Sequence, residues 1–586
     1  IDVWTLADSN SYMDGYEVQI SPNGTTYTSL GFTVNKNSRS ANGMVNVITS
    51  IPAGKNARFV KIIMHNSNDS QQLKVGEIAI WGARPYDITL PVNSVPEKVA
   101  VSARVKSYNK LYLDWSGYNH VVSDVNKYCL YVETENFTTV ADKTPVKTYN
   151  SGSTTQIYKF AAYFPLEPET TYYIAITPFT SSGVERQDVT PLQITTPPVI
   201  NTNGKLGNMF CVNDPPYGAG AYESHADEWS NMLMKADLLG EVGDIQKNRW
   251  FNHDAVVMDQ YNRRGISFHL FYNDPSKLSL DTSWGVWSYS TYNEPDLANR
   301  DVVAVAAALN ANHTALKSVD SRYVLFEPAL GDTNTPGYTW LEDLYNADGQ
   351  NGDLVRTYFD VMDVHAYCKY ADPYPTGLIH GVPEALIDKI DTLKTIMASH
   401  GDSAKPIVFT ELGWSMYTGG SYLRKVDQIT QRNYLVRAYM HAAANDIKAI
   451  FWHNFQDNGT NPANIEHNFG IIDWYGDPKP AFYGYYTLCR VLADAVYQAP
   501  LSGISNPYYG YRFWDQSKGV YITSLWAADE TTRIATFATT DAGVKVVGTD
   551  GSFEYETANG GAVDVTISGA PVFIYSTAPL TVSSID

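Results

Sequence analysis

The chain has 586 residues, of which 44% are hydrophobic, and a formal net charge of −20. It has no run rich in lysine or arginine, so nucleic acids and anionic membranes, which require a basic surface, are poor partners, and we expect neither. No apolar run approaches the roughly 18 residues that cross a bilayer, so membrane insertion is not expected. A chain this long needs several domains, and its acidic surface suits a neutral polymer.

Residues 1–84 alternate in the manner of β-strands. Strand-like runs cover 16–20 and 59–63, and a Pro-Asn-Gly turn follows the first of them. A turn between alternating runs indicates a hairpin. The pattern resembles the later strands of a discoidin-type, galactose-binding-like β-sandwich, and we expect a partial module with a structural role.

Residues 92–197 follow a proline-containing linker and again read as short strands. Trp115 lies at the end of one strand, and residues 166–172 carry the pattern Leu-x-Pro-x-Thr-x-Tyr. Both features resemble a fibronectin type III domain, in which a tryptophan fills the core and a tyrosine ties a loop. The resemblance implies a spacer.

Residues 198–495 change to strands and helices in alternation, which predicts parallel βα units. The first strands are expected at 209–212, 245–249 and 266–271, with helices at 227–239 and 254–263. Further helices are expected at 302–316, 383–400 and 427–444, and later strands at 323–327 and 449–452. The pattern predicts a (β/α)8 barrel.

The third unit of this barrel is short. About a dozen residues separate the strand at 266–271 from the next apolar run, and they contain no helical period, whereas a full βα crossover takes roughly ten to twelve residues including a helix. We therefore expect the third helix to be missing, shortened or replaced, and local closure of the barrel is in doubt. Residues 496–586 return to strand-like runs separated by glycines, which predicts an antiparallel β-sandwich.

Two glutamates follow buried strand-like runs in the predicted barrel. Glu294 follows the run 286–289, and Glu411 follows the run 406–409. Carboxylates at the ends of barrel strands face a cleft. A pair of them is what glycoside hydrolysis requires, because one acid protonates the leaving oxygen and the other carboxylate attacks the anomeric carbon or activates water.

The segment 205–495 resembles the clan of retaining glycosidases built on (β/α)8 barrels, and more narrowly glycoside hydrolase family 39 with its endo-acting, exopolysaccharide-cleaving relatives. Besides the two glutamates, the matching segments are 363–367 (Asp-Val-His-Ala-Tyr), 410–415 (Thr-Glu-Leu-Gly-Trp-Ser), 451–453 (Phe-Trp-His), 468–473 (Asn-Phe-Gly-Ile-Ile-Asp) and 478–482 (Pro-Lys-Pro-Ala-Phe). The resemblance implies that Glu294 is the general acid/base and Glu411 the nucleophile. The alternative is two solvated surface glutamates.

The same resemblance implies five substrate-binding or positioning residues. Asn293 would hydrogen-bond the sugar 2-hydroxyl, or form a turn before Pro295. Arg249 would orient the nucleophile, or form a structural ion pair. Tyr367 would hydrogen-bond the nucleophile with His365 beside it, and Trp452 would stack on the sugar ring. An alternating strand places only some of them in the cleft.

Five further residues are weaker candidates for the site. Glu327 is either a subsite contact or a buried, paired acid, and weaker subsite candidates are His269, Trp414, His453 and Asp457. Histidines on separate strands form no ligand motif, and the four cysteines lack metal-ligand spacing, so no metal and no cofactor are expected.

Together these features predict a multidomain enzyme with a TIM barrel flanked by β-sandwich domains. We expect a retaining glycoside hydrolase that cleaves β-linked polysaccharide, with an endo mode of action. Alternatives are an exo-acting β-xylosidase-like enzyme and a catalytically inactive carbohydrate-binding or surface scaffold protein. The chain opens at Ile1 without a signal peptide, which we interpret as a mature or trimmed form of a secreted or cell-surface protein. The sequence leaves the oligomeric state open.

Overall fold

The computed structural model describes the chain from residue 95 onward with gaps, and only the strands of residues 1–94. The gaps are 108, 116–117, 119–124, 151–159, 164–165, 181, 199–208, 214–227, 243–246, 251–254, 265, 272–285, 332, 348–353, 369–380 and 419–425. The chain divides into two compact units, Ile1–Pro91 and Val92–Asp586.

The first unit contains two small antiparallel sheets, with strand orders β4–β1–β6 and β3–β2–β5. Its described strands are β1 (Asp2–Ala7), β2 (Gly15–Ser21), β3 (Thr28–Ser29), β4 (Gly43–Ile48), β5 (Phe59–His65) and β6 (Val75–Ala79). The strands predicted at 16–20 and 59–63 therefore exist. The likeness to discoidin-type modules stays a prediction, and the turn at 22–24 lies outside the described residues.

The second unit begins with two antiparallel sheets, ordered β11–β8–β7 and β10–β9–β12–β13. Their strands are β7 (Ser102–Ser107), β8 (Lys110–Asp114), β9 (Val125–Glu133), β10 (Lys147–Asn150), β11 (Phe160–Tyr163), β12 (Thr171–Thr180) and β13 (Leu192–Thr195). Trp115 is buried among Tyr128 and Tyr149, and the hydroxyl of Tyr172 accepts a hydrogen bond from the N–H of Glu167 at 2.9 Å. This arrangement agrees with the predicted roles of the tryptophan and the tyrosine.

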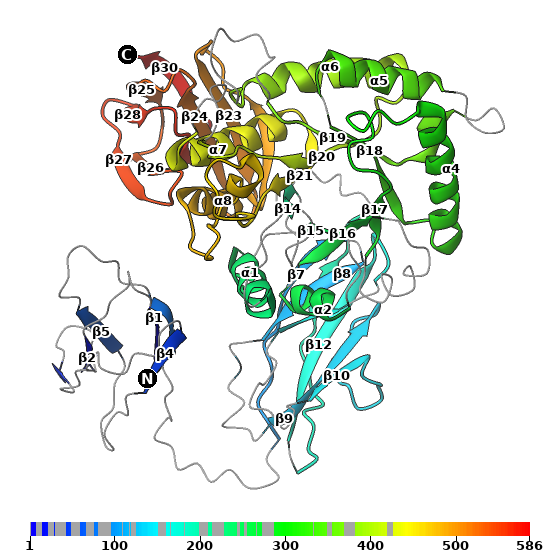
Figure 1. The fold of residues 1–586 in the computed structure, drawn as a ribbon. Coiled ribbons are helices and arrows are strands. Elements are labelled where there is room, and N and C mark those ends of the chain that lie inside the picture. Colours follow the sequence, from blue (N-terminus) through cyan, green and yellow to red (C-terminus); the bar gives the residue numbers. More distant parts are fainter. Residues whose placement is uncertain are drawn as a thin grey trace. The chain divides into compact units, whose positions relative to one another are not determined.

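Eight parallel strands then form a closed barrel (Figure 1). They are β14 (Phe210–Asn213), β15 (Lys247–Trp250), β16 (Ser267–Phe271), β17 (Ser288–Ser290), β18 (Val324–Leu330), β19 (Val361–His365), β20 (Ile407–Leu412) and β21 (Ile447–His453). β14 pairs with β21, and β16 pairs with β17, so the doubt about local closure was wrong. Residues 272–285, where the third helix was expected to be lacking, lie outside the described residues.

Helices follow the barrel strands and bury their apolar sides. Those described are α1 (Glu228–Val242), α2 (Ala255–Arg263), α4 (Val302–Val319), α5 (Thr335–Asn346), α6 (Ala385–Ser399), α7 (Gln428–Ala444) and α8 (Pro480–Leu492). Leu435, Ala438, Tyr439 and Ala442 of α7 are buried, as their spacing predicts. Among the helices described here, none combines the length and apolarity needed to span a membrane.

The chain ends in two antiparallel sheets, ordered β22–β23–β24–β29–β26–β27 and β28–β25–β30. Their strands are β22 (Ala495–Pro500), β23 (Tyr508–Asp515), β24 (Val520–Ala527), β25 (Arg533–Ala538), β26 (Gly543–Val547), β27 (Phe553–Thr557), β28 (Ala562–Ile567), β29 (Val572–Ser576) and β30 (Thr581–Ile585). Phe513, Ile522 and Phe573 of the larger sheet share one hydrophobic core with the barrel.

A buried polar network joins this sheet to the barrel. The carboxylate of Glu384, just before α6, accepts hydrogen bonds from Arg437 Nε at 2.9 Å and from Trp526 Nε1 at 3.0 Å. His441 of α7 lies 3.4 Å from the same carboxylate through Nε2 and 2.9 Å from the hydroxyl of Tyr511 through Nδ1. Burial alone would raise the pKa of Glu384, but Arg437 and His441 hold it well below its usual range.

Candidate active site

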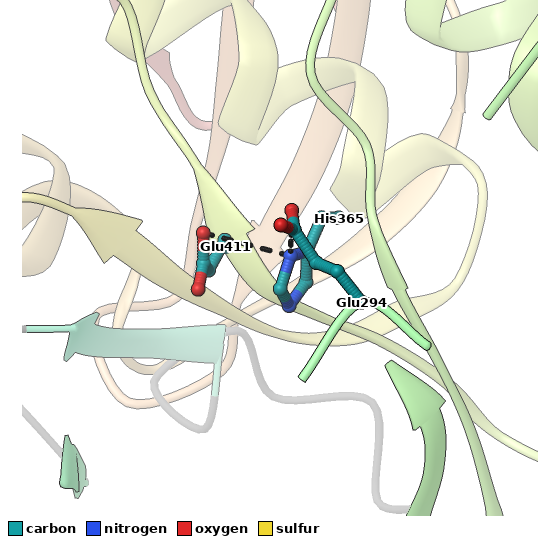
Figure 2. A group of neighbouring side chains, drawn as sticks. All are labelled: Glu294, His365 and Glu411. Carbon is teal, nitrogen blue, oxygen red and sulfur yellow. Dashed lines mark hydrogen bonds and ion pairs between the residues drawn. The ribbon is translucent and has the colours of Figure 1, made fainter. Parts of the chain in front are cut away.

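Six of the seven predicted site residues come together at the carboxyl ends of the barrel strands. They are Arg249 in β15, Asn293 and Glu294 after β17, His365 at the end of β19, Tyr367 just beyond it, and Glu411 in β20. Figure 2 shows Glu294 and Glu411 with His365 linked to both. This end of a TIM barrel is where active sites form.

Glu411 is held as an ionised carboxylate by two donors, the buried Arg249 and the half-buried Tyr367. Arg249 Nη1 donates to its Oε1 at 2.5 Å, and the hydroxyl of Tyr367 donates to its Oε2 at 3.0 Å. Burial alone would raise the pKa of Glu411, but its interactions with His365, Arg249 and His453 outweigh burial and hold the pKa well below its usual range. Burial, followed by the charge of Glu411, raises the pKa of Tyr367, so the phenol keeps the proton that it donates.

The backbone of β20 is irregular where Glu411 lies. Its pairing with β21 shifts register between Phe409 and Leu412. In a regular strand Thr410 and Glu411 would point to opposite faces, whereas here Thr410 contacts Asp363 and His365 while Glu411 contacts Arg249 and Tyr367. The irregularity therefore brings two successive side chains to the site.

Glu294 lies in a strained backbone conformation at the mouth of the barrel. Its φ is 48°, a region that non-glycine residues rarely adopt, and its N–H donates to the carbonyl of Ala329 at 3.1 Å. Its side chain is 27% exposed. Gly331, beyond β18, packs directly against that side chain, and its N–H donates to Asp296 Oδ1 at 2.8 Å. Strain of this kind persists where the surrounding structure holds a functional side chain in place.

His365 connects the two glutamates. Its Nδ1 lies 2.9 Å from Oε1 of Glu294 and 3.5 Å from Oε2 of Glu411, and its Nε2 lies 3.2 Å from Oγ1 of Thr410. The ring is fully buried. A single imidazole therefore links the candidate acid to the strand that carries the candidate nucleophile.

Asn293 is exposed at the mouth and is oriented by the same arginine that holds Glu411. Arg249 Nη2 donates to Asn293 Oδ1 at 2.8 Å. Because the oxygen of the amide is used in this way, its NH2 group is the end left to donate to a ligand. The prediction that Arg249 orients the nucleophile agrees with this geometry.

Trp452 is the one predicted site residue that the structure does not bring to the cluster. It is fully buried and packs against Trp414 at 5.9 Å and against Tyr439 of α7 at 6.5 Å, measured between ring centroids. Its neighbour Phe451 instead contacts His269, and His453 contacts Tyr367. Successive residues of β21 alternate between faces, so the expectation that Trp452 stacks on a sugar ring disagrees with this placement.

His453 takes the position expected for Trp452. Its ring lies 4.9 Å from that of Phe469, and its Nε2 lies 3.6 Å from Oε2 of Glu466. Burial alone would lower the pKa of His453, but Glu466 and Glu411 raise it above its usual value. The sequence named His453 only as a weak subsite candidate.

Asp363 and Thr410 were missed. Both are fully buried and hydrogen-bonded to each other, and Thr410 also contacts the histidine of the site. The two-residue spacing of Asp363 and His365 was the available signal, since it places both on one face of a strand. Gly331 carried no such signal.

The remaining weak candidates are buried and structural. The carboxylate of Glu327 accepts a hydrogen bond from the N–H of Thr291, and burial raises its pKa to about 8. His269 lies between the hydroxyls of Ser288 and Ser290 at 3.1 and 2.8 Å. Asp457 Oδ2 pairs with Lys479 Nζ at 2.6 Å, and Trp414 is fully buried.

Among the described residues, one group has the geometry to ligate a metal ion, and it is Glu294, His365 and Glu411 with ligand atoms within 4.8 Å of one another. Two carboxylates linked by an imidazole are also the apparatus of acid–base and nucleophilic catalysis. Because Arg249 and Tyr367 already donate to both oxygens of Glu411, the group fits this second role better.

Comparison with known proteins bears directly on this cluster. Residues 288–476, which contain both glutamates, match the family model described as "Glycosyl hydrolase catalytic core". The chain therefore carries a glycoside hydrolase catalytic core. A search of curated proteins finds no match to this glycoside hydrolase.

Solved structures that match this chain include the following three. A family 39 glycoside hydrolase from Bacteroides cellulosilyticus WH2 is 16% identical, with coverage of 77% of this chain and 94% of that one and a TM-score of 0.47. A monomeric β-xylosidase from Caulobacter crescentus CB15 is 12% identical, with coverage of 65% and 98% and a TM-score of 0.42. An α-L-arabinofuranosidase from Thermotoga maritima is 9% identical, with coverage of 63% and 96% and a TM-score of 0.44.

Proposed function

We propose that this glycoside hydrolase retains the anomeric configuration, with Glu294 as general acid/base and Glu411 as nucleophile. One observation carries the proposal: carboxylate oxygens of the two glutamates lie within 4.8 Å of each other. Retaining enzymes hold their carboxyl groups about 5–5.5 Å apart, whereas inverting enzymes need roughly 6.5–9.5 Å to admit a water molecule.

The environments of the two glutamates support this division of roles. Glu411 has two donors and a depressed pKa, so it is ionised and ready to attack the anomeric carbon. As that bond forms, the bond to the leaving oxygen breaks and Glu294 transfers its proton to that oxygen. In the second half, water gives a proton to Glu294 while its oxygen attacks the anomeric carbon, which releases Glu411.

The proposed substrate is a β-linked polysaccharide cut internally by a secreted or cell-surface enzyme. The exposed NH2 group of Asn293, oriented by Arg249, is placed to donate to a sugar hydroxyl beside the reacting carbon. Flanking β-sandwich modules, for which we infer spacer or structural roles, favour a polymer over a small glycoside. Exo-acting, β-xylosidase-like cleavage is the alternative within the same chemistry.

The test is hydrolysis of a panel of β-linked polysaccharides and aryl β-glycosides by the wild type, Glu411→Ala and Glu294→Ala. We expect the wild type to release long oligosaccharides first, with the anomer formed first seen by NMR in the β configuration. Azide added to Glu294→Ala should give a β-glycosyl azide, because azide needs no base and attacks the same intermediate as water.

Three other outcomes of this test would contradict parts of the proposal. Release of monosaccharides alone would establish the exo alternative. An α-anomer as first product would exclude the retaining mechanism. Binding of glycans without hydrolysis under any condition would favour the inactive scaffold.

A further inference from the structure

A chain of hydrogen bonds extends behind His365, away from the two glutamates. Thr410 Oγ1 lies 2.8 Å from both carboxylate oxygens of Asp363, and the N–H of Thr410 donates to Asp363 Oδ1 at 3.1 Å. The same Oγ1 lies 3.2 Å from His365 Nε2, and the opposite ring nitrogen lies 2.9 Å from Glu294 Oε1. The chain therefore runs from Asp363 through Thr410 and His365 to Glu294.

The direction of these bonds follows from the hydrogens available. A threonine hydroxyl has one hydrogen to donate, and an ionised carboxylate can only accept. Burial raises the pKa of Asp363, while the charge of Arg249 and the two donors of Thr410 oppose that rise. With Asp363 ionised, it accepts from both donors of Thr410, so the hydroxyl hydrogen points to Asp363 and only lone pairs of Oγ1 face His365. The hydrogen between Thr410 and His365 must then belong to Nε2.

The charged and titratable groups around this ring come from several barrel strands. They are Arg249 on β15, Glu294 after β17, Asp363 and Tyr367 with β19, Glu411 on β20 and His453 on β21. Among the residues that the structure describes, Glu294 and Glu411 are the titratable groups that approach Nδ1, at 2.9 and 3.5 Å, and Glu294 is the nearer. Arg249 and Tyr367 already donate to Glu411, so Glu294 is the group that exchanges a proton with Nδ1.

We propose that Asp363 and Thr410 are positioning residues that fix a hydrogen on Nε2 of His365, so that Nδ1 and Glu294 Oε1 hold between them the one proton delivered to the leaving group. This inference rests on the proposed function of Glu294. In the first half-reaction the shared proton passes to the glycosidic oxygen. The Glu294 carboxylate is then left facing the lone pair of Nδ1, which favours its taking a proton from the attacking water.

Removing the hydroxyl of Thr410 should undo this arrangement. Thr410→Val keeps the shape but offers Nε2 no acceptor, so the ring can place its hydrogen on Nδ1 and donate it to the Glu294 carboxylate. That bond stabilises the ionised form of the acid. We expect kcat to fall about tenfold, part of the roughly 10²–10⁴-fold that general acid catalysis provides. The alkaline limb of the pH profile of kcat/KM should move to lower pH, and Thr410→Ser should restore both.

A direct readout is ¹⁵N NMR of histidine-labelled protein, with His365 assigned among the 12 histidines by comparison with His365→Asn. We expect the neutral ring of the wild type to carry its hydrogen on Nε2, and Thr410→Val to move population to the Nδ1 form. A wild-type ring protonated on Nδ1 would overturn the inference. So would Thr410→Val with an unchanged tautomer, or with reduced kcat and an unchanged pH profile.

The two proposals fail separately. If the wild type hydrolyses no glycoside, the proposed function is wrong, while the NMR measurement still decides the state of His365. If Thr410→Val does not fold, the wild-type spectrum alone tests the placement of the hydrogen on Nε2. Thermal unfolding of each variant distinguishes a folded protein with an altered tautomer from a disrupted one.

Discussion

Gly331 and Glu294 are in contact so close that no side chain fits between them: a Cβ on Gly331 would lie 2.7 Å from Cγ and 2.8 Å from Cβ of Glu294. Real Cβ atoms do not approach so closely, and the third neighbour, Leu297 Cδ1, is also 2.8 Å away. Gly331→Ala should therefore displace Glu294. A misplacement of about 1 Å can cost roughly 10²-fold, so we expect kcat to fall by that order with little change in KM. Gly240→Ala, in α1 away from the site, is the control, and unchanged kcat in Gly331→Ala would contradict this assignment.

Arg249 holds both Glu411 and Asn293, so replacing it should alter charge and geometry together. Arg249→Lys keeps a positive charge but loses the planar fork whose two nitrogens contact Glu411 and Asn293 separately. Glu411 then loses part of the stabilisation of its ionised form, and its pKa rises. Because the nucleophile works as a carboxylate, activity lies above this pKa, and the acidic limb of the profile of kcat/KM should move to higher pH. Arg264→Lys, which alters a surface pair with Asp237, should leave the profile unchanged.

Trp452 should matter for stability rather than for substrate binding. It packs against Trp414 and Tyr439 and is fully buried, so Trp452→Phe leaves a cavity behind the barrel wall. We expect the free energy of unfolding to fall by about 1–3 kcal/mol while KM stays near the wild-type value. A large rise in KM without loss of stability would contradict this structural role and indicate that Trp452 binds substrate.

Glu327 should make folding depend on pH in the neutral range. Its pKa is raised to about 8 in the folded protein from a usual value of 4.5, so the folded state favours the protonated acid. Stability is therefore greatest below 4.5 and declines as pH rises toward 8, by on the order of 3 kcal/mol at pH 7. Glu327→Gln should remove this decline. Denaturant unfolding between pH 5 and 8 checks it, and parallel curves for wild type and variant would contradict the buried acid.

Glu384 should give the free energy of unfolding a pH dependence opposite to that of Glu327. Its pKa is depressed, so its contribution to stability is complete above its usual value of 4.5 and is lost as pH falls toward the folded-state pKa. Glu384→Gln removes the buried counter-charge of Arg437 and leaves it the half-exposed Glu530 at 3.9 Å, so we expect a loss of roughly 3 kcal/mol at neutral pH. The variant should also lose less stability than the wild type on acidification, which denaturant unfolding at pH 3 to 7 would show.

The sequence was most informative in two kinds of segment. One has a clear hydrophobic periodicity, and in the other a charged residue ends an apolar run. Alternating strands and helices predicted the barrel, and Glu294 and Glu411 stood out because each ends such a run. Trp452 was misplaced because residues 450–452 are all apolar, so nothing in the pattern indicates which of them faces the barrel interior. Thr410 escaped notice because strand alternation assigns it to the face opposite Glu411, and only the register shift of β20 brings both to the site.

The buried network around Glu384 also limits how this enzyme can be divided. Trp526 and Tyr511 complete the hydrogen bonding of two polar side chains of the barrel helices, and Phe513, Ile522 and Phe573 fill the core beside them. A barrel expressed without residues 496–586 would present that apolar surface and those polar groups to water. A portable catalytic piece, whether in recombination between genes or in protein engineering, therefore includes residues 496–586 together with the barrel.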